Sequence, residues 1–213
     1  MTTDSATCLL VIAKSPKPGR VKTRLTPPLS PVQAARLAEA ALADTLAVVA
    51  DCPAKRRILV LEGEPGDWLP PGFDLVKQHG DGLDERIAHA FAIIDGPGLL
   101  IGMDTPQVTG ELLEPALTPD AWNGVDAWFG PATDGGFWAL GFRRPRPDLV
   151  LGVPMSRDDT GRIQRERLTG AGLRVRDLPM LTDVDTMSDV EKVAGLADGG
   201  LFAGEVKAME VTR

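Results

Sequence analysis

The residues best suited to chemistry near the start of this chain are basic, and they directly follow an apolar run, Leu9–Ile12. The chain has 213 residues and a formal net charge of −7, yet no Asp or Glu occurs between Asp4 and Glu39. The basic residues of this interval are Lys14, Lys17, Arg20, Lys22, Arg24 and Arg36. Such a local excess of cations in an acidic protein predicts a site for a concentrated anion, most simply the phosphates of a nucleotide.

The segment after the apolar run has the composition of a phosphate-binding loop. Glycine permits a tight bend at Gly19, while Pro16 and Pro18 stiffen the approach to it. Basic residues then alternate with others, so an extended conformation would place them on one side, where Arg and Lys can pair with phosphate oxygens. The expected nucleotide contacts are Lys14, Gly19, Arg20, Lys22 and Arg24. A solvated surface loop is the alternative, and the segment matches neither a Walker loop nor a Gly-x-Gly-x-x-Gly fingerprint.

Aspartates in two distant stretches could complete such a site. Asp104 follows a predicted buried strand at 99–102, and the carboxyl ends of strands in open α/β sheets form the crevice that binds ligands. Asp183 and Asp185 are two residues apart, so in an extended segment both side chains point the same way. Phosphates and carboxylates repel each other unless a cation lies between them, so these three aspartates are expected to hold Mg²⁺ or Mn²⁺. For each one alone, a turn or a helix cap is the alternative role.

The glycine-rich stretch Gly130–Trp138 could contact a second substrate. Paired glycines let a backbone pass close to a ligand. Asp134 within it is a candidate base for activating an acceptor, a further metal contact or a turn residue. The expected acceptor contacts are Gly135, Gly136, Trp138 and Ser156, although Trp138 is also typical of a core strand. The expected catalytic residues are Asp104, Asp134 and Lys22.

Strands and helices alternate along the chain, which is typical of an α/β protein with a mostly parallel sheet covered on both faces. Strands are expected at 9–13, 58–61, 74–76, 99–102, 127–129, 137–140 and 173–178. Helices are expected at 31–50, 83–94, 161–171 and 187–197, with a shorter one after Thr109. Ser30 and Gln33 form a capping box before the first of these helices. We expect one nucleotide-binding domain over 1–213, in which the tail 199–213 is structurally ambiguous and could pack through Leu201, Phe202, Val206 and Met209.

Composition excludes several classes of protein. An acidic chain lacks the basic face that nucleic-acid binding needs, so no nucleic-acid partner is expected. Two cysteines, Cys8 and Cys52, are too few for a disulfide scaffold and are expected to be reduced thiols. No basic leader and no apolar run of membrane-spanning length is present, so a cytoplasmic location without a membrane span is expected.

Four motifs in order carry a resemblance to a known family: Lys14–Leu25, Gly102–Pro106, Gly130–Trp138 and Asp183–Thr186. Together they resemble a bacterial family of the nucleotide-diphospho-sugar transferase (GT-A) superfamily, some of whose members are named arsenosugar-biosynthesis glycosyltransferases. A more distant likeness is to the guanylyltransferases of deazaflavin- and molybdenum-cofactor biosynthesis. The acidic run Arg157–Asp159 departs from the family pattern and puts the role of that loop in question.

The resemblance implies a three-layer α/β/α sandwich with a mainly parallel mixed sheet. It also implies a nucleotide over the N-terminal half and a divalent ion held by Asp104, with Asp185 as the better match for the second aspartate contact. The expected function is metal-dependent glycosyl transfer from a nucleotide-diphospho-sugar to a small acceptor. The alternative is nucleotidyl transfer from a nucleoside triphosphate to a phosphorylated or carboxylate acceptor, and a non-catalytic nucleotide-binding regulator is a third reading. The sequence leaves open the base, the sugar, the acceptor and the oligomeric state.

Overall fold

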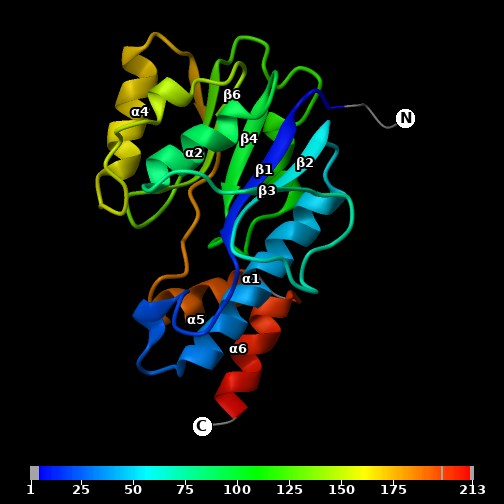
Figure 1. Cartoon of the computed structure of the whole chain (residues 1–213), viewed down its shortest axis with the longest axis vertical. Helices are drawn as coiled ribbons and strands as arrows, with labels where there is room; N and C mark the ends of the chain where they lie inside the picture. The colour runs from blue at the N-terminus through cyan, green and yellow to red at the C-terminus, as the bar shows by residue number, and fades with distance from the viewer. Residues whose placement is uncertain (1–4, 198, 212–213) are drawn as a thin grey trace.

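A seven-stranded mixed sheet forms the centre of the molecule in the computed structural model, which describes residues 5–197 and 199–211. Its strands are β1 (Cys8–Lys14), β2 (Arg56–Glu62), β3 (Asp74–Lys77), β4 (Gly98–Gly102), β5 (Ala127–Pro131), β6 (Phe137–Phe142) and β7 (Val175–Asp177). They lie in the order β3-β2-β1-β4-β6-β5-β7 (Figure 1). Only β6 pairs antiparallel, with β4 on one side and β5 on the other; the other four pairings are parallel. The predicted mainly parallel mixed sheet is therefore confirmed.

Helices cover both faces of this sheet. They are α1 (Pro31–Asp51), α2 (Leu83–Ala92), α3 (Gly110–Leu113), α4 (Thr160–Gly170), α5 (Met187–Leu196) and α6 (Leu201–Val211). Short 3₁₀ helices are η1 (Thr23–Leu25), η2 (Glu114–Ala116) and η3 (Pro147–Leu149). The predicted capping box of Ser30 and Gln33 is present at the start of α1. None of the described helices is both long and apolar enough to cross a lipid bilayer.

The alternation of side chains along β1 explains the three layers. Leu9 and Val11 point to the face covered by α1 and α3, whereas Leu10 and Ile12 point to the face covered by α2 and α4. All four side chains are buried, as expected for a central strand in a sheet covered on both faces. The three-layer α/β/α sandwich predicted from the resemblance is confirmed.

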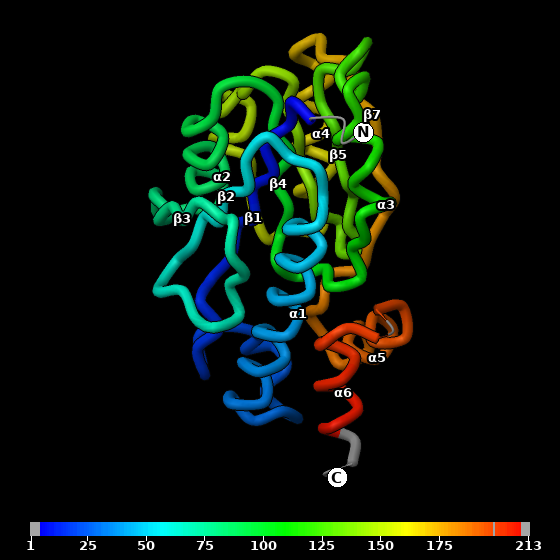
Figure 2. The backbone as a smooth tube through the Cα atoms, turned by 90° about the vertical axis from the view of Figure 1, so that its right-hand side faces the viewer, coloured from blue at the N-terminus to red at the C-terminus, as the bar shows by residue number. Residues whose placement is uncertain are grey.

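A second group of helices lies below the sheet in Figures 1 and 2, and we call it the helical cluster: η1, the N-terminal half of α1, α5 and α6. It has a small core of its own, made by residues such as Leu25, Leu37, Val184 and Phe202. Helix α1 serves both regions, because one stripe of its residues packs on the sheet and a second stripe packs on the cluster.

The structurally ambiguous C-terminal tail is largely the helix α6, which lies along α1. Phe202 and Val206 pack in the cluster core as expected, but Leu201 remains 63% exposed. Leu201 begins the helix, and its amide and that of Phe202 donate hydrogen bonds of 2.9 Å to the carboxylate of Asp44. This contact joins residues 157 positions apart, so no local pattern could indicate it.

Candidate active site

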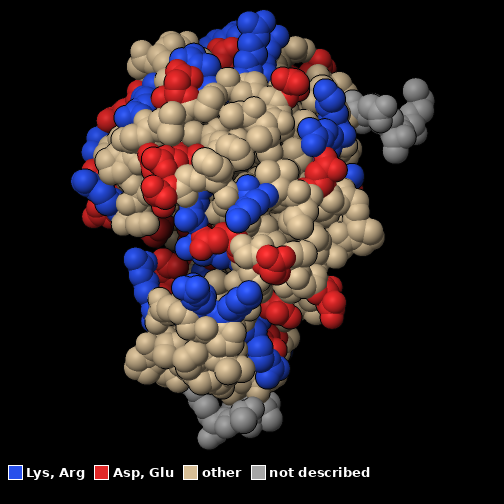
Figure 3. Space-filling view, in the orientation of Figure 1, with Lys and Arg blue, Asp and Glu red and all other residues tan. Residues whose placement is uncertain are grey.

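A cleft of about 790 Å³ separates the carboxyl edge of the sheet from the helical cluster. It is lined from above by residues at the ends of β1 and β4 and the start of β6, and from below by η1 and the segment 183–186. In the space-filling view, basic and acidic side chains gather on both sides of this indentation (Figure 3). The cleft is large enough for a nucleotide-sized ligand.

The sheet brings Asp104 and Asp134 to the same edge. Strand β4 ends at Gly102, two residues before Asp104, and β6 begins at Phe137, three residues after Asp134. Because β6 runs antiparallel to β4, its start lies beside the end of β4. Both aspartates line the cleft. The position predicted for Asp104 from the end of a buried strand is thus the one observed.

An extended segment carries two further aspartates across this edge. Leu181 forms a parallel bridge with Ala132, and the amide of Val184 donates to the backbone oxygen of Asp104 at 3.0 Å. Val184 is buried in the core of the helical cluster, while Asp183 and Asp185 on either side of it line the cleft. The alternation expected for residues two apart places both carboxylates beside Asp104.

The basic segment is not extended, which corrects the expected alternation of Arg20, Lys22 and Arg24. Positive φ angles at Gly19 (72°) and Lys22 (48°) turn the chain, and a 3₁₀ helix, η1, follows at once. The segment folds back because Leu25 is fully buried in the helical cluster. Nevertheless Arg20, Lys22 and Arg24 all line the cleft.

Lys22 and Arg24 are paired directly with the aspartates. The ammonium group of Lys22 forms an ion pair with Asp104, lies 3.8 Å from Asp185 and donates to the backbone oxygen of Val184. Arg24 pairs with Asp185 at 2.8 Å. The structure therefore brings the N-terminal cations and all three predicted metal-binding aspartates into one site.

Of the two remaining predicted nucleotide contacts, Lys14 and Gly19, one lines the cleft and the other does not. Lys14 lines the cleft at the end of β1 and lies 3.5 Å from the carboxylate of Glu62. Gly19 is not among the residues that line the cleft, and its contribution is the turn that its positive φ allows.

The pKa of Asp183 reflects its position in the cleft. Burial raises the pKa of Asp183 to about 7, and the carboxylates of Asp104 and Asp134 act in the same direction, while Lys22 acts in the opposite one. Its Oδ1 atom is buried and has no hydrogen-bond partner. A buried carboxylate oxygen without a partner, beside other carboxylates, is costly unless a cation completes its surroundings.

These residues fit a divalent cation in donor chemistry, because Asp104, Asp183 and Asp185 offer the hard carboxylate oxygens that Mg²⁺ and Mn²⁺ prefer. As the side chains stand, however, no group of three or more His, Cys, Asp or Glu within residues 5–197 and 199–211 is arranged to hold an ion. Between Asp104 and Asp185 lies the ammonium group of Lys22 instead.

The expected acceptor residues divide into two groups. Gly136 and Ser156 line the cleft, and Ser156 has a positive φ of 58°. Gly135 serves packing, because a Cβ there would lie 1.8 Å from the backbone oxygen of Asp158. Trp138 borders the cleft but is only 2% exposed, and its indole nitrogen donates to the oxygen of Pro179 at 3.0 Å. The surroundings of Trp138 are those of a residue in a core strand, which was the alternative stated for it.

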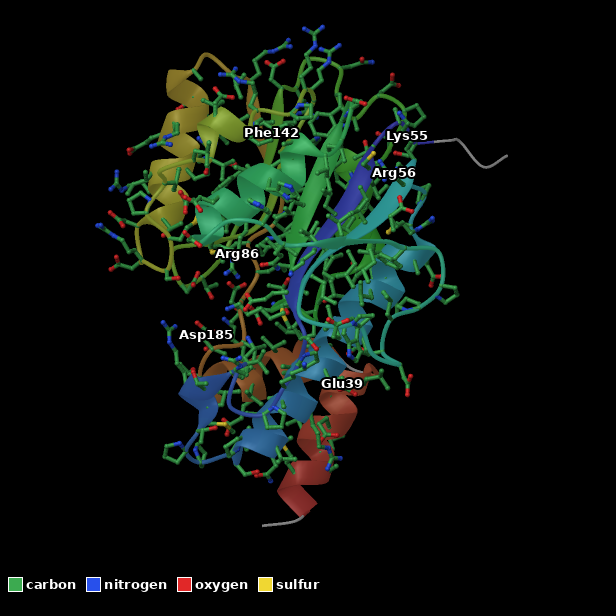
Figure 4. The ribbon with its side chains drawn as sticks, viewed as in Figure 1. Glu39, Lys55, Arg56, Arg86, Phe142 and Asp185 are labelled. Atoms are coloured by element: carbon green, nitrogen blue, oxygen red, sulfur yellow. The ribbon has the colours of Figure 1, made fainter. Side chains whose placement is uncertain are left out.

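Sequence reasoning missed a polar network at the other end of the cleft. Gln78 donates to the backbone oxygens of Ala13 and Val60 and accepts from Arg86, which in turn pairs with Glu62. Although burial opposes it, the hydrogen bond from Arg86 lowers the pKa of Glu62. In Figure 4, Arg86 and Asp185 lie on facing sides of the space between the sheet and the helical cluster. The position of Gln78 directly after β3, at the carboxyl edge, was the available signal.

The fold is that of the nucleotide-diphospho-sugar transferases, with the cleft at the carboxyl edge of the sheet as expected for an open α/β architecture. The chain belongs to the family described as uncharacterized proteins conserved in bacteria (DUF2064), whose sequence model matches residues 32–157. The matched region contains Asp104 and Asp134 but neither the basic segment nor Asp183 and Asp185. No curated protein matches the chain.

Solved structures of bacterial proteins share this fold. A candidate nucleotide-diphospho-sugar transferase from Desulfovibrio desulfuricans G20 is 29% identical, with a TM-score of 0.86 over 97% of this chain and 96% of that one. Rv0371C of Mycobacterium tuberculosis H37Rv, solved in complex with manganese, is 20% identical, with a TM-score of 0.54 over 90% and 98% of the two chains. The 2-C-methyl-D-erythritol 4-phosphate cytidylyltransferase of Thermus thermophilus is 16% identical, with a TM-score of 0.53 over 91% and 98%.

Proposed function

We propose that this protein is a metal-dependent transferase that takes a nucleotide-diphospho-sugar as donor and moves the glycosyl group to a small acceptor. The observation that carries the proposal is the meeting of Lys22 and Arg24 with Asp104 and Asp185 across one nucleotide-sized cleft. Cations for a diphosphate and carboxylates for a metal thus occupy the same site. The likeness to the Desulfovibrio protein over nearly the whole of both chains supports this assignment.

On the donor side, the exposed cations would hold the diphosphate. Arg20 and Arg24 present guanidinium groups to the cleft, and Lys14 adds a compact charge at the end of β1. Guanidinium groups form forked hydrogen bonds with phosphate oxygens, so these residues would orient the donor and stabilise charge on the departing diphosphate.

Asp104, Asp183 and Asp185 would hold a divalent cation. When bound, Mg²⁺ or Mn²⁺ supplies neutralisation of the charge that develops on the leaving diphosphate. The buried Oδ1 of Asp183, which lacks a partner, is the donor that most needs such an ion. The manganese complex of Rv0371C supports metal use within this fold.

Asp134 would act on the acceptor. Its Oδ1 accepts a hydrogen bond from the amide of Gly136 at 2.8 Å, which fixes the carboxylate at the cleft. In the transfer, an acceptor hydroxyl oxygen forms a bond with the anomeric carbon as the bond from that carbon to the diphosphate oxygen breaks. The hydroxyl proton passes to Asp134 and the nucleoside diphosphate leaves.

Nucleotidyl transfer is the second candidate, and the density of cations favours it. Lys14, Arg20 and Arg24 line the cleft besides Lys22, and this number of cations suits the three phosphates of a nucleoside triphosphate. In this reaction an acceptor oxygen attacks the α-phosphorus of a nucleoside triphosphate, and pyrophosphate leaves. The cytidylyltransferase of Thermus thermophilus uses the same fold.

A panel of nucleoside triphosphates and nucleotide-diphospho-sugars, each with Mg²⁺ or Mn²⁺, tests the proposal. Stabilising compounds are found by thermal shift and then incubated with candidate acceptors, and the released product is identified. Release of a nucleoside diphosphate supports glycosyl transfer, whereas release of pyrophosphate establishes the second candidate. Metal-dependent binding without consumption of any donor would make the protein a nucleotide-binding regulator and refute both.

A further inference from the structure

Lys22 occupies an unusual position for a lysine in a phosphate-binding segment. Its side chain retains only 6% of its exposure, whereas that of Arg24 retains 70% and that of Lys14 retains 54%. Its ammonium group is held by Asp104, by the backbone oxygen of Val184 and, at 3.8 Å, by Asp185. The cation is therefore directed into the carboxylates and away from solvent.

The backbone fixes this position. Lys22 and Ser156 are the two non-glycine residues with positive φ in the described part of the chain, and both line the cleft. A side-chain-bearing residue in this conformation persists only where its surroundings enforce it. Here η1 follows directly, and Leu25 at its end is fully buried in the helical cluster. Folding of the cluster thus delivers the ammonium group to the aspartates.

The oxygen acceptors gathered around this positive charge are also the kind of ligand that a divalent cation prefers. We propose that Lys22 is an internal counter-ion that competes with the divalent cation for Asp104 and Asp185. Metal then binds firmly only when polyphosphate draws Lys22 out of the carboxylates. This inference rests on the proposed function, because it assumes that the same aspartates hold the ion.

Competition between Lys22 and a divalent cation for the same oxygens predicts the direction of one change: loss of the lysine must raise the affinity for the metal. Removing the lysine charge leaves Asp104 and Asp185 facing each other and Asp183 without a compensating cation, so a divalent ion gains attraction and loses its competitor. If Lys22 were only a structural ion pair, its removal would reduce stability without strengthening metal binding. Metal affinity therefore separates the two roles.

The experiment is a titration of the full-length protein with Mn²⁺ alone, with no nucleotide present, followed by calorimetry and by the electron paramagnetic resonance signal of free Mn²⁺. Lys22→Met is expected to bind Mn²⁺ about tenfold or more tightly than the wild type. Lys22→Arg keeps the charge and should stay within about twofold of the wild type. Lys17→Met removes a charge from an exposed position of the same segment, and it should also match the wild type.

Two further variants serve as controls for this experiment. Lys22→Gln replaces Lys22→Met if the latter melts far below the wild type. Adding Asp104→Asn to Lys22→Met should abolish the gained affinity, which assigns the gain to this site. Equal Mn²⁺ affinity in wild type and Lys22→Met, or a gain that survives Asp104→Asn, would overturn the inference. Neither result affects the proposed function, which depends on the product released in the donor panel.

Discussion

The carboxyl edge of the sheet and the helical cluster contribute opposite halves of the site, and the hydrophobic cores that hold these halves differ in size. Asp104 and Asp134 extend from strands whose ladders are buried between two large cores. Arg24 and Asp185 depend on a small core around Leu37 and Phe202. The site is thus assembled where two separately packed regions meet. Of the two, only the sheet contributes site residues that lie within residues 32–157, the part of the chain that the family model matches.

Because the two regions have separate cores, the site can be disturbed through the helical cluster without loss of the sheet. The chain passes between the regions at the basic segment after β1, within α1 and at the segment 181–185. Local opening of the helical cluster should remove Arg24, Asp185 and Lys22 from the cleft together, because all three depend on the same core. Opening of the sheet should unfold the protein.

Phe202→Ala is the strongest test of this comparison. Phe202 is fully buried in the cluster core, so truncation should cost about 3–5 kcal/mol, and the loss of stability should be confined to η1, α5, α6 and the segment 181–186. Hydrogen exchange should show loss of protection there while β1 and β4 remain protected. Phe142→Ala, equally buried in the sheet core, is the matched control and should lower protection in every strand. An even loss across the sheet in Phe202→Ala would remove the distinction between the regions.

Asp104→Asn and Asp185→Asn compare the two halves in binding. We expect Asp104→Asn to weaken metal-dependent nucleotide binding by about 100-fold, or about 2.7 kcal/mol. We expect about tenfold from Asp185→Asn, because Arg24 still reaches the nucleotide from the same side. Calorimetry with Mg²⁺ measures both, and the same titration in chelator should show little difference among the three proteins. The reverse order of effects would place the main metal ligand on the helical cluster.

Asp183→Asn tests whether burial and the carboxylates of the other half of the site raise the pKa of Asp183. Since the pKa of Asp183 is raised to about 7 in the folded state, its contribution to stability is complete below about pH 4 and is lost as the pH rises through 7. Without metal, Asp183→Asn should therefore melt a few degrees above the wild type at about pH 8 and close to it at about pH 4. Melting curves across this pH range in chelator measure the difference. A difference in melting temperature that stays constant across this pH range would show that the pKa of Asp183 is not raised in the folded protein.

The sheet was predictable because its signals are local. The apolar run of β1, the capping box at Ser30 and the strand that ends before Asp104 each depend on neighbouring residues. Even the shared direction of Asp183 and Asp185 follows from alternation in a short extended segment.

The helical side of the site was not predictable in the same way. Lys22 lies 162 residues from the backbone oxygen that it binds, and η1 forms because Leu25 enters a core that α1 shares with the C-terminal helices α5 and α6. Gly135 illustrates a different failure, because glycines that admit a ligand and glycines that admit another backbone have the same signature in sequence.

Asp44→Ala probes how firmly α6 holds the helical cluster in place, and we expect the smallest effect from it. The Asp44 carboxylate accepts from the amides of Leu201 and Phe202, so its loss leaves the start of α6 uncapped, at a cost of about 1 kcal/mol. Asp44→Asn keeps an acceptor and should lose less, while Glu39→Ala, at an exposed position of the same helix, should match the wild type. Chemical denaturation measures all three. Asp44 does not line the cleft, so a loss of nucleotide affinity in Asp44→Ala would show that α6 positions Asp185 and Arg24 through the cluster core, whereas unchanged affinity would confine the role of α6 to stability.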